Sequence, residues 1–491
     1  MDRGIDARCF GAEDRRRDRG GARPGGRACC GRSGNVSTCG VPFRGAGRPR
    51  TLLLFALGIG LVVRLARVAR DPLVHPDGPA YLDLATALAR GELMPVLGGY
   101  FSPLYPAAVS IVAATGLGLE LAGRLTAVLA GVALLPLVYS VARRLLGESA
   151  AGATVLVAAV QPALVKSSAQ VLPETLAGTL LAGWLLVLLT ERDGRPATAG
   201  MLAGATYLAR PEGVMLVPLG LWRFRRRPRG ALLYLAAALL VMAPALVALR
   251  IEHGHWQLSP REGRIAARSG ATSFIGAATQ HPVRFLGGTA VGAARQAAYD
   301  AKALGALLWV PFVAGLLVAR GADRWPLVVV LWFTALPLAI NPSPRYAVPL
   351  LSLLLPWAGA GIVALGQRLG RHAGLAAAAV GTGLVVQALW VSHPFDAACT
   401  REVSALLLRR YGPGQALVAV DGRFAYGARG KAIVPRSTDP AEALALARRY
   451  GARLWLTRPA WIAPPWTPPA DVRPVARPCG GAFVLFDLDG S

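Results

Sequence analysis

The sequence predicts an α-helical polytopic membrane protein with about eleven transmembrane helices and a small C-terminal α/β domain outside the cytoplasm. Hydrophobic residues make up 54% of the 491 residues, above the usual roughly 45–50% that already counts glycine. Only 16% of the residues are charged, and they cluster between long apolar segments instead of alternating with apolar positions, as they would on soluble helices. Such a chain buries its apolar surface in lipid.

The formal net charge of +26 would suggest nucleic acid as the partner of a soluble protein. Here the arginines lie in short connections between apolar segments, as in residues 223–229. The positive-inside rule places such connections in the cytoplasm. The charge therefore indicates a lipid bilayer as the partner and argues against nucleic acid.

The chain divides into three parts. Residues 1–50 are rich in Gly and Arg, without an apolar segment before Thr51, and predict a disordered cytoplasmic tail with no cleavable signal peptide. Residues 51–392 form the transmembrane domain, and residues 393–491 form the small extracytoplasmic domain. We expect a multi-pass protein of the plasma or inner membrane with its N-terminus in the cytoplasm.

Long apolar segments set the predicted crossings, because a spanning helix needs about 20 mostly apolar residues. Residues 197–222 are one apolar segment broken at 210–212, which predicts two short helices or a segment that dips in and returns. The other predicted crossings are 52–69, 121–142, 150–165, 174–190, 231–249, 303–319, 325–340, 346–366 and 373–392.

Two long loops, 70–120 and 250–302, fall on the outer side in this topology. Counting residues 101–118 as a full crossing would place the basic pair Arg143 and Arg144 outside. We therefore expect Tyr81–Arg90 and Leu104–Leu117 to be helices that lie in the outer interface.

The last part of the chain alternates strand and helix patterns. Strands are expected at 416–420, 432–435, 453–456 and 482–488, with a helix at 440–450 that Asp439 caps. Cys399 and Cys479 bracket this domain. Outside the cytoplasm they are a candidate disulfide, and two unrelated buried thiols are the alternative.

An acid in the first outer loop is the main candidate for chemistry. Asp77 lies in the segment His75-Pro76-Asp77-Gly78-Pro79-Ala80-Tyr81, just after the first crossing. One interpretation is a helix cap, since Asp favours that position and Pro favours the first turn. The other is a catalytic carboxylate at the membrane surface.

An ordered set of short motifs resembles the GT-C superfamily of lipid-linked-sugar glycosyltransferases, especially the branch of protein O-mannosyltransferases and the lipid A aminoarabinose transferase. The motifs are Asp77 with Tyr81, Arg124-Leu125, Arg143 to Gly147, Leu208 to Gly213, and Pro344-Arg345-Tyr346. Two positions depart from the family pattern: Gly78, where many relatives have a second acid, and Ser102, where some have Lys.

The resemblance implies transfer of a sugar from a polyprenyl phosphate to an acceptor hydroxyl at the outer face, with inversion and with Asp77 as general base. Glu174 is the second candidate catalytic acid, although an acid in a first helical turn is also favoured by the macrodipole. The predicted substrate-binding residues are Arg64, Tyr81, Asp83, Lys166, Arg210, Arg345 and Tyr346. Snorkelling to the headgroups is the alternative for Arg64 and the other basic residues.

The expected partners are the lipid-linked sugar and an acceptor glycan, lipid or protein. No cofactor is predicted, and a divalent ion shared by Asp77 and Glu174 stays open. Two alternatives from other classes also remain: a secondary transporter, for which paired broken helices would be expected, and an inactive membrane scaffold of the same fold.

Overall fold

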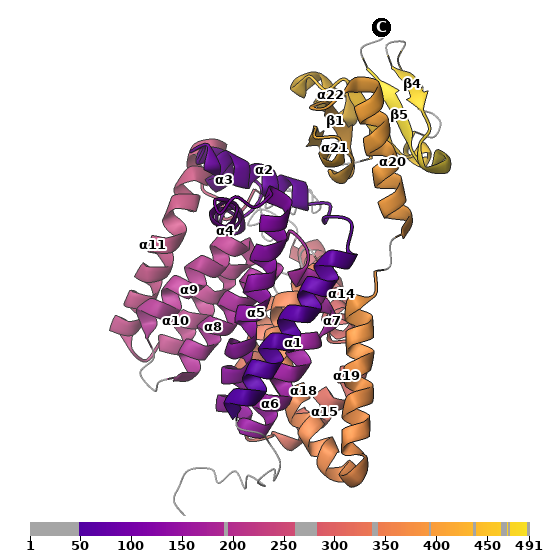
Figure 1. The fold of residues 1–491 in the computed structure, drawn as a ribbon. Helices are drawn as coiled ribbons and strands as arrows, with labels where there is room; N and C mark the ends of the chain where they lie inside the picture. Colours follow the sequence, from indigo (N-terminus) through magenta and orange to yellow (C-terminus); the bar gives the residue numbers. More distant parts are fainter. Residues whose placement is uncertain are drawn as a thin grey trace, which may run out of the picture. The chain divides into compact units, whose positions relative to one another are not determined.

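A computed structural model describes residues 49–190, 195–260, 282–335, 342–391, 394–435, 438–462, 469 and 472–488. The predicted tail, apart from its last residues, and the centre of the loop 250–302 lie outside the described residues. The described chain is mainly helical, with a small sheet near its C-terminal end, as predicted (Figure 1).

Most helices follow the predicted segments, whereas those at 94–97 and 282–304 lie in the predicted outer loops and were not predicted. In the first half they are α1 (Pro49–Arg70), α2 (Gly78–Ala89), α3 (Met94–Leu97), α4 (Leu104–Ala113), α5 (Leu119–Leu146), α6 (Glu148–Val160), α7 (Pro162–Ser168), α8 (Glu174–Thr190), α9 (Pro196–Ala209), the 3-10 helix η1 (Pro211–Met215), α10 (Leu216–Phe224) and α11 (Pro228–His253). Then come α14 (Pro282–Leu304), α15 (Ala306–Val318), α16 (Trp325–Ala335), η2 (Pro344–Tyr346), α18 (Ala347–Leu369), η3 (Gly370–His372) and α19 (Ala373–Leu389).

Four helices of the described chain are long and apolar enough to cross a membrane, or up to six if each of two bent pairs is one span. Three shorter apolar helices accompany them, at Leu104–Ala113, Glu174–Thr190 and Trp325–Ala335. The expected total of about eleven crossings stays a prediction. The predicted outer helices in the first loop correspond to α2 and α4.

Two predicted crossings contain a sharp bend. The segment 150–165 breaks at Gln161 into α6 and α7, which differ in direction by 52°. Pro162 has no N–H to continue the ladder of α6, and the side chain of Gln161 caps α7 by accepting from the N–H of Leu164 at 2.8 Å. The segment 303–319 breaks at Gly305, where α14 and α15 meet at 102°.

Helix α18 is the centre of the transmembrane packing, since it contacts α5, α6, α8 and α15.

 Every residue of α18 from Ala347 to Gly359 is buried, and Ala360 is half-buried. Gly315 of α15 and Gly361 of α18 allow the two backbones to touch, because a Cβ on either glycine would collide with a carbonyl of the other helix. Small residues permit such close approach in membrane bundles.

The C-terminal region contains a five-stranded sheet in the order β2-β1-β3-β5-β4. Strands β1 (Ala416–Ala419), β2 (Lys431–Ile433) and β3 (Leu454–Thr457) pair in parallel, whereas β5 (Val484–Asp487) is antiparallel to β3 and β4 (Arg473–Ala476). Helices α20 (Pro394–Tyr411), α21 (Arg423–Gly427) and α22 (Pro440–Tyr450), with the short turns η4 (Pro459–Trp461) and η5 (Cys479–Gly481), complete the region. Strand β4 and helices α20 and α21 were not predicted.

Two local predictions in this region are confirmed. The side chain of Asp439 caps α22 by accepting from the N–H of Ala441 at 2.9 Å. Cys399 and Cys479 form a disulfide with a Cα–Cα distance of 5.1 Å, so the alternative of two separate thiols does not hold. The bond joins α20 to the segment just before β5 and closes a long loop around the sheet.

Candidate active site

Arg345 links the two candidate catalytic acids. It lies in η2, immediately before α18, while Asp77 precedes α2 and Glu174 begins α8. The Nη1 of Arg345 donates to Oδ2 of Asp77, and its Nε and Nη2 lie 2.7 and 2.6 Å from Oε1 of Glu174. Three segments far apart in the sequence therefore meet at one guanidinium.

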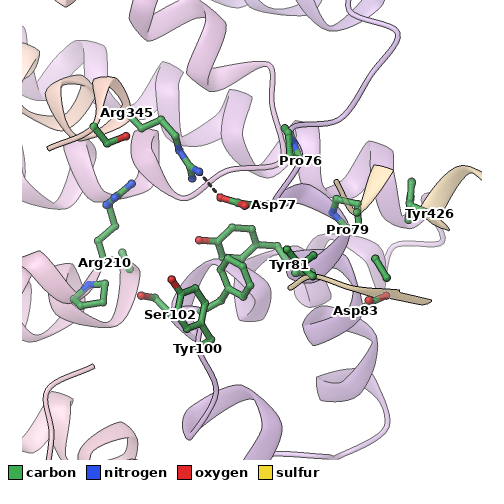
Figure 2. Close-up of a pocket in the computed structure, with 18 of the residues that line it drawn as sticks. Pro76, Asp77, Pro79, Tyr81, Asp83, Tyr100, Ser102, Arg210, Arg345 and Tyr426 are labelled. Carbon is green, nitrogen blue, oxygen red and sulfur yellow. Dashed lines mark hydrogen bonds and ion pairs between the residues drawn. The ribbon is translucent and has the colours of Figure 1, made fainter. Parts of the chain in front are cut away.

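The cap interpretation of Asp77 is not supported, because its side chain makes no cap hydrogen bond to α2. Its backbone N–H donates instead to Nδ1 of His75 at 3.2 Å, and its carboxylate faces Arg345 (Figure 2). The Asp77 side chain is 37% exposed. The carboxylate is thus oriented by the loop and accessible to a ligand.

Glu174 is the buried end of the network, with a side chain only 1% exposed. Its Oε1 also accepts from Nη1 of Arg210 at 2.6 Å. Its Oε2 has no hydrogen-bond partner among the described residues. A buried carboxylate is costly unless it is paired, and the two arginines supply that pairing.

Arg210 is placed by the predicted break in the segment 197–222. Pro211 cannot continue the hydrogen bonds of α9, and Gly213 packs directly on the backbone of Thr206 and Tyr207, where a Cβ would collide. The freed Arg210 side chain turns to Glu174 and Glu212 and lies 4.6 Å above the ring of Tyr346. This explains physically why Arg-Pro-x-Gly suits the position.

A cavity of about 390 Å³, the first cavity, opens beside Asp77. Tyr81, Asp83, Arg210, Arg345 and Tyr346 line it together with Asp77. In Figure 2, Arg210 lies at one end, with Asp83 and Tyr426 at the other. Its two acidic and two basic residues balance in charge, and its tyrosines provide flat surfaces suited to a polar organic substrate.

A second cavity, of about 520 Å³, is also lined by Arg345. Pro76 and Arg345 line both cavities, whereas His75, Lys166 and Glu174 line only the second. Burial lowers the pKa of His75 from 6.5 to about 4, with the positive charge of Arg345 as a further cause. His75 is therefore neutral at physiological pH and accepts the Asp77 N–H through Nδ1.

The predicted substrate-binding residues divide into two groups. Tyr81, Asp83, Arg210, Arg345 and Tyr346 line the first cavity, and Lys166 lines the second. Arg64 lines neither of the two cavities.

Arg64 is instead fully buried, and its guanidinium bonds to Ser168 and to the carbonyl oxygens of Gly60, Ala158 and Ala159. Arg64 therefore joins helices within the bundle and does not contact either cavity.

Sequence reasoning did not single out several residues of these cavities. Tyr100 lines the first cavity together with Ser102, the position at which some members of the resembled family have Lys. Tyr426 of α21 also lines this cavity. Lys302, at the end of α14, lines the second cavity. The available signal for Lys302 was its position at the end of the predicted outer loop 250–302, whereas no local sequence pattern indicates a role for Tyr426.

Metal binding has a limited basis in the described residues, which contain no group of three or more His, Cys, Asp or Glu suited to an ion. Asp77 and Glu174, for which a shared divalent ion was left open, are bridged by Arg345.

Comparisons with known proteins agree with this fold. Residues 102–249 match the family model of dolichyl-phosphate-mannose-protein mannosyltransferases. The crystal structure of ArnT from Cupriavidus metallidurans bound to undecaprenyl phosphate is similar with a TM-score of 0.56 and 16% identity, covering 89% of this chain and 98% of that one. No curated protein sequence matches the chain.

An oligosaccharyltransferase from Archaeoglobus fulgidus, in complex with Zn and sulfate, is also similar, with a TM-score of 0.52 and 14% identity over 83% of this chain and 68% of that one. These matches confirm the resemblance to the GT-C superfamily that the sequence motifs indicated. The chain is a helical membrane protein with the GT-C fold.

Proposed function

We propose that this chain is a membrane glycosyltransferase that moves a sugar from a polyprenyl phosphate to an acceptor hydroxyl, with Asp77 as the general base. The observation that carries the proposal is the position of the Asp77 carboxylate, which is accessible, lines a cavity and adjoins a guanidinium. The family model and the undecaprenyl phosphate bound to the similar ArnT support a lipid-linked donor.

The proposed reaction places the acceptor in the first cavity, next to Asp77. The carboxylate accepts the hydroxyl proton while the acceptor oxygen forms a bond to the anomeric carbon of the sugar. The bond from that carbon to the phosphate oxygen breaks, and the electron pair leaves with the polyprenyl phosphate. Attack opposite the leaving phosphate inverts the anomeric centre.

The leaving phosphate needs positive charge that is already in place, because its own charge grows as the bond breaks. Arg345 is held by Glu174 in a fixed orientation, and a guanidinium binds phosphate oxygens in a fork. Lys166 lines the same second cavity. We assign both residues to phosphate binding, and Arg210 and Tyr346 to the support of Glu174 and the cavity wall.

The remaining assignments extend the predicted topology. We place both cavities at the outer face of the plasma or inner membrane, with the domain of residues 393–491 on the same side. Tyr81 and Asp83 line the first cavity and are assigned to acceptor binding. The acceptor is a glycan, a lipid or a protein.

The test is transfer of label from radiolabelled polyprenyl-phosphate mannose, arabinose or glucose to candidate acceptors by the purified protein. Asp77→Asn removes the base and is expected to lower the rate at least about 100-fold. Glu92→Gln is the matched control, since Glu92 is an exposed acid of the same loop. Equal rates for wild type and Asp77→Asn would exclude the proposed mechanism.

Solute uptake separates the transferase from the transporter alternative. Proteoliposomes containing the wild type are expected to transfer label between lipid and acceptor without accumulating small solutes. Uptake that persists in Asp77→Asn, without any transfer by the wild type, would favour a transporter. Neither activity in any assay would favour the scaffold.

A further inference from the structure

Arg345 separates two cavities of different charge. The first cavity has Asp77 and Asp83 against Arg210 and Arg345, so acidic and basic residues are equal in number. In the second cavity basic residues outnumber acidic residues by five to three: Arg67, Lys166, Lys302, Arg345 and Arg423 against Asp71, Glu174 and Asp396. A phosphate group is therefore favoured in the second cavity.

The partners of these charges strengthen that preference. Arg67 pairs with Asp71, and Arg423 pairs with Asp421. Within the described chain, Lys166 and Lys302 have no ion pair. Two lysines of the second cavity are thus available to an anion that also contacts Arg345.

The two ends of the Arg345 network differ in how firmly they are held. Nε and Nη2 are fixed on Glu174, whose side chain is 1% exposed, while Nη1 is bonded to Asp77, whose side chain is 37% exposed. An ion pair open to solvent contributes little to stability, whereas breaking a buried one is costly. The contact with Asp77 is therefore the easier of the two for an anion to replace.

We propose that the phosphate of the lipid donor, bound in the second cavity, takes Nη1 of Arg345 from Asp77 and so frees the carboxylate to accept the acceptor's proton. This inference rests on the proposed function and adds an order to it. Before the donor binds, one oxygen of the Asp77 carboxylate accepts a hydrogen bond from Arg345. After it binds, the phosphate holds the guanidinium and Asp77 faces the first cavity alone.

The exchange needs no change in net protonation, because one anionic partner of Arg345 replaces another. Arginine forms paired, charge-assisted hydrogen bonds with phosphate, and Glu174 keeps the fork oriented throughout. The base is thereby released from its ion pair only when a leaving group is present, which couples deprotonation of the acceptor to occupancy by the donor.

The test measures the reactivity of the Asp77 carboxyl group toward a water-soluble carbodiimide and an amine, read by mass spectrometry on the full-length purified protein. Labelling of the exposed Glu92 in the same sample is the internal reference. Undecaprenyl phosphate is expected to raise the ratio of Asp77 to Glu92 labelling about two- to fivefold, the range that loss of a part-exposed ion pair supports.

Three further samples identify the cause of the rise. Undecaprenol, which lacks the phosphate, is expected to leave the ratio unchanged, and an equal rise with it would overturn the proposal. A rise with inorganic phosphate alone would support the exchange and assign it to the phosphate group without its lipid. No rise with undecaprenyl phosphate would overturn the proposal.

Variants keep the test independent of lipid binding. Arg345→Gln is expected to give a high labelling ratio without lipid and no further rise with it, and a low ratio would show that Arg345 does not cover Asp77. Transfer activity with a flat labelling ratio would leave the glycosyltransferase standing and remove the exchange. A labelling ratio that rises with phosphate, without transfer to any acceptor, would support the exchange and contradict the proposed glycosyltransferase activity.

Discussion

The Nη1 of Arg64 in α1 donates a hydrogen bond of 2.8 Å to the carbonyl oxygen of Ala159 in α6. The carbonyl of Ala158 would normally bond to the N–H four residues later, but that residue is Pro162, which has none. Nη2 of Arg64 lies 3.4 Å from this oxygen. Arg64 therefore satisfies the end of α6 at the bend between α6 and α7.

Replacing Arg64 with Gln is expected to destabilise the protein by at least about 2 kcal/mol, because buried carbonyl groups lose a charged donor. Arg70→Gln is the control, since Arg70 lies on the same helix and is exposed. The apparent Tm in detergent measures both. A similar Tm for the two variants would contradict the capping role.

Gly361→Ala is expected to lower the apparent Tm because the new methyl group meets the carbonyl of Pro311 in α15. Overpacking of this kind costs about 1–3 kcal/mol. Gly366→Ala on the same helix is the matched variant, since its nearest neighbour would be the Cβ of Ala373 at 3.9 Å. An unchanged Tm in Gly361→Ala would mean that α15 and α18 separate at no cost.

The helices and the candidate acid were predictable because their signals are local. Apolar length marks the helices, and Pro211 breaks its segment wherever that segment folds. The meeting of Arg345 with Glu174 was not predictable, because the two residues are 171 positions apart and no motif links them.

The sequence also did not predict that the Arg64 side chain points into the helix bundle. An almost uniformly apolar helix gives little indication of which face turns to lipid and which to the bundle. The break at Gly305 was missed for a similar reason, since the apolar signal continues through it. Tertiary contacts decide these features, and local patterns do not encode them.

His75 is expected to make stability depend on pH between 6.5 and about 4. Because burial lowers its pKa on folding, the unfolded chain binds a proton in this window that the folded chain does not. Stability is therefore fully present above pH 6.5 and is lost as the pH falls toward 4.

The measurement compares wild type with His75→Asn, which keeps a hydrogen-bond acceptor for the Asp77 N–H and does not titrate. The apparent Tm of the wild type is expected to fall relative to that of the variant as the pH drops from 7 to about 4.5. Parallel Tm curves for the two proteins would contradict the lowered pKa of His75.

Removing the disulfide between Cys399 and Cys479 is expected to destabilise the C-terminal region by about 2–4 kcal/mol, since the bond closes a long loop. Limited proteolysis of Cys399→Ser at rising temperature measures the effect. Thr400→Ser, at the adjacent and also buried position of α20, is the control. Equal protease resistance of both variants would show that the bond adds no stability.

The predicted topology places the C-terminal region outside the cytoplasm and the basic connection 223–229 inside. Ala445→Cys on α22 and Arg226→Cys in that connection are both at exposed positions, and each is introduced after the four tail cysteines are replaced by serine. An impermeant maleimide is expected to label the cysteine at 445 in intact cells and the cysteine at 226 only after lysis. Because charge bias sets orientation for the whole bundle, the opposite labelling pattern would move Asp77 to the cytoplasmic face and remove the outer-face reaction with it.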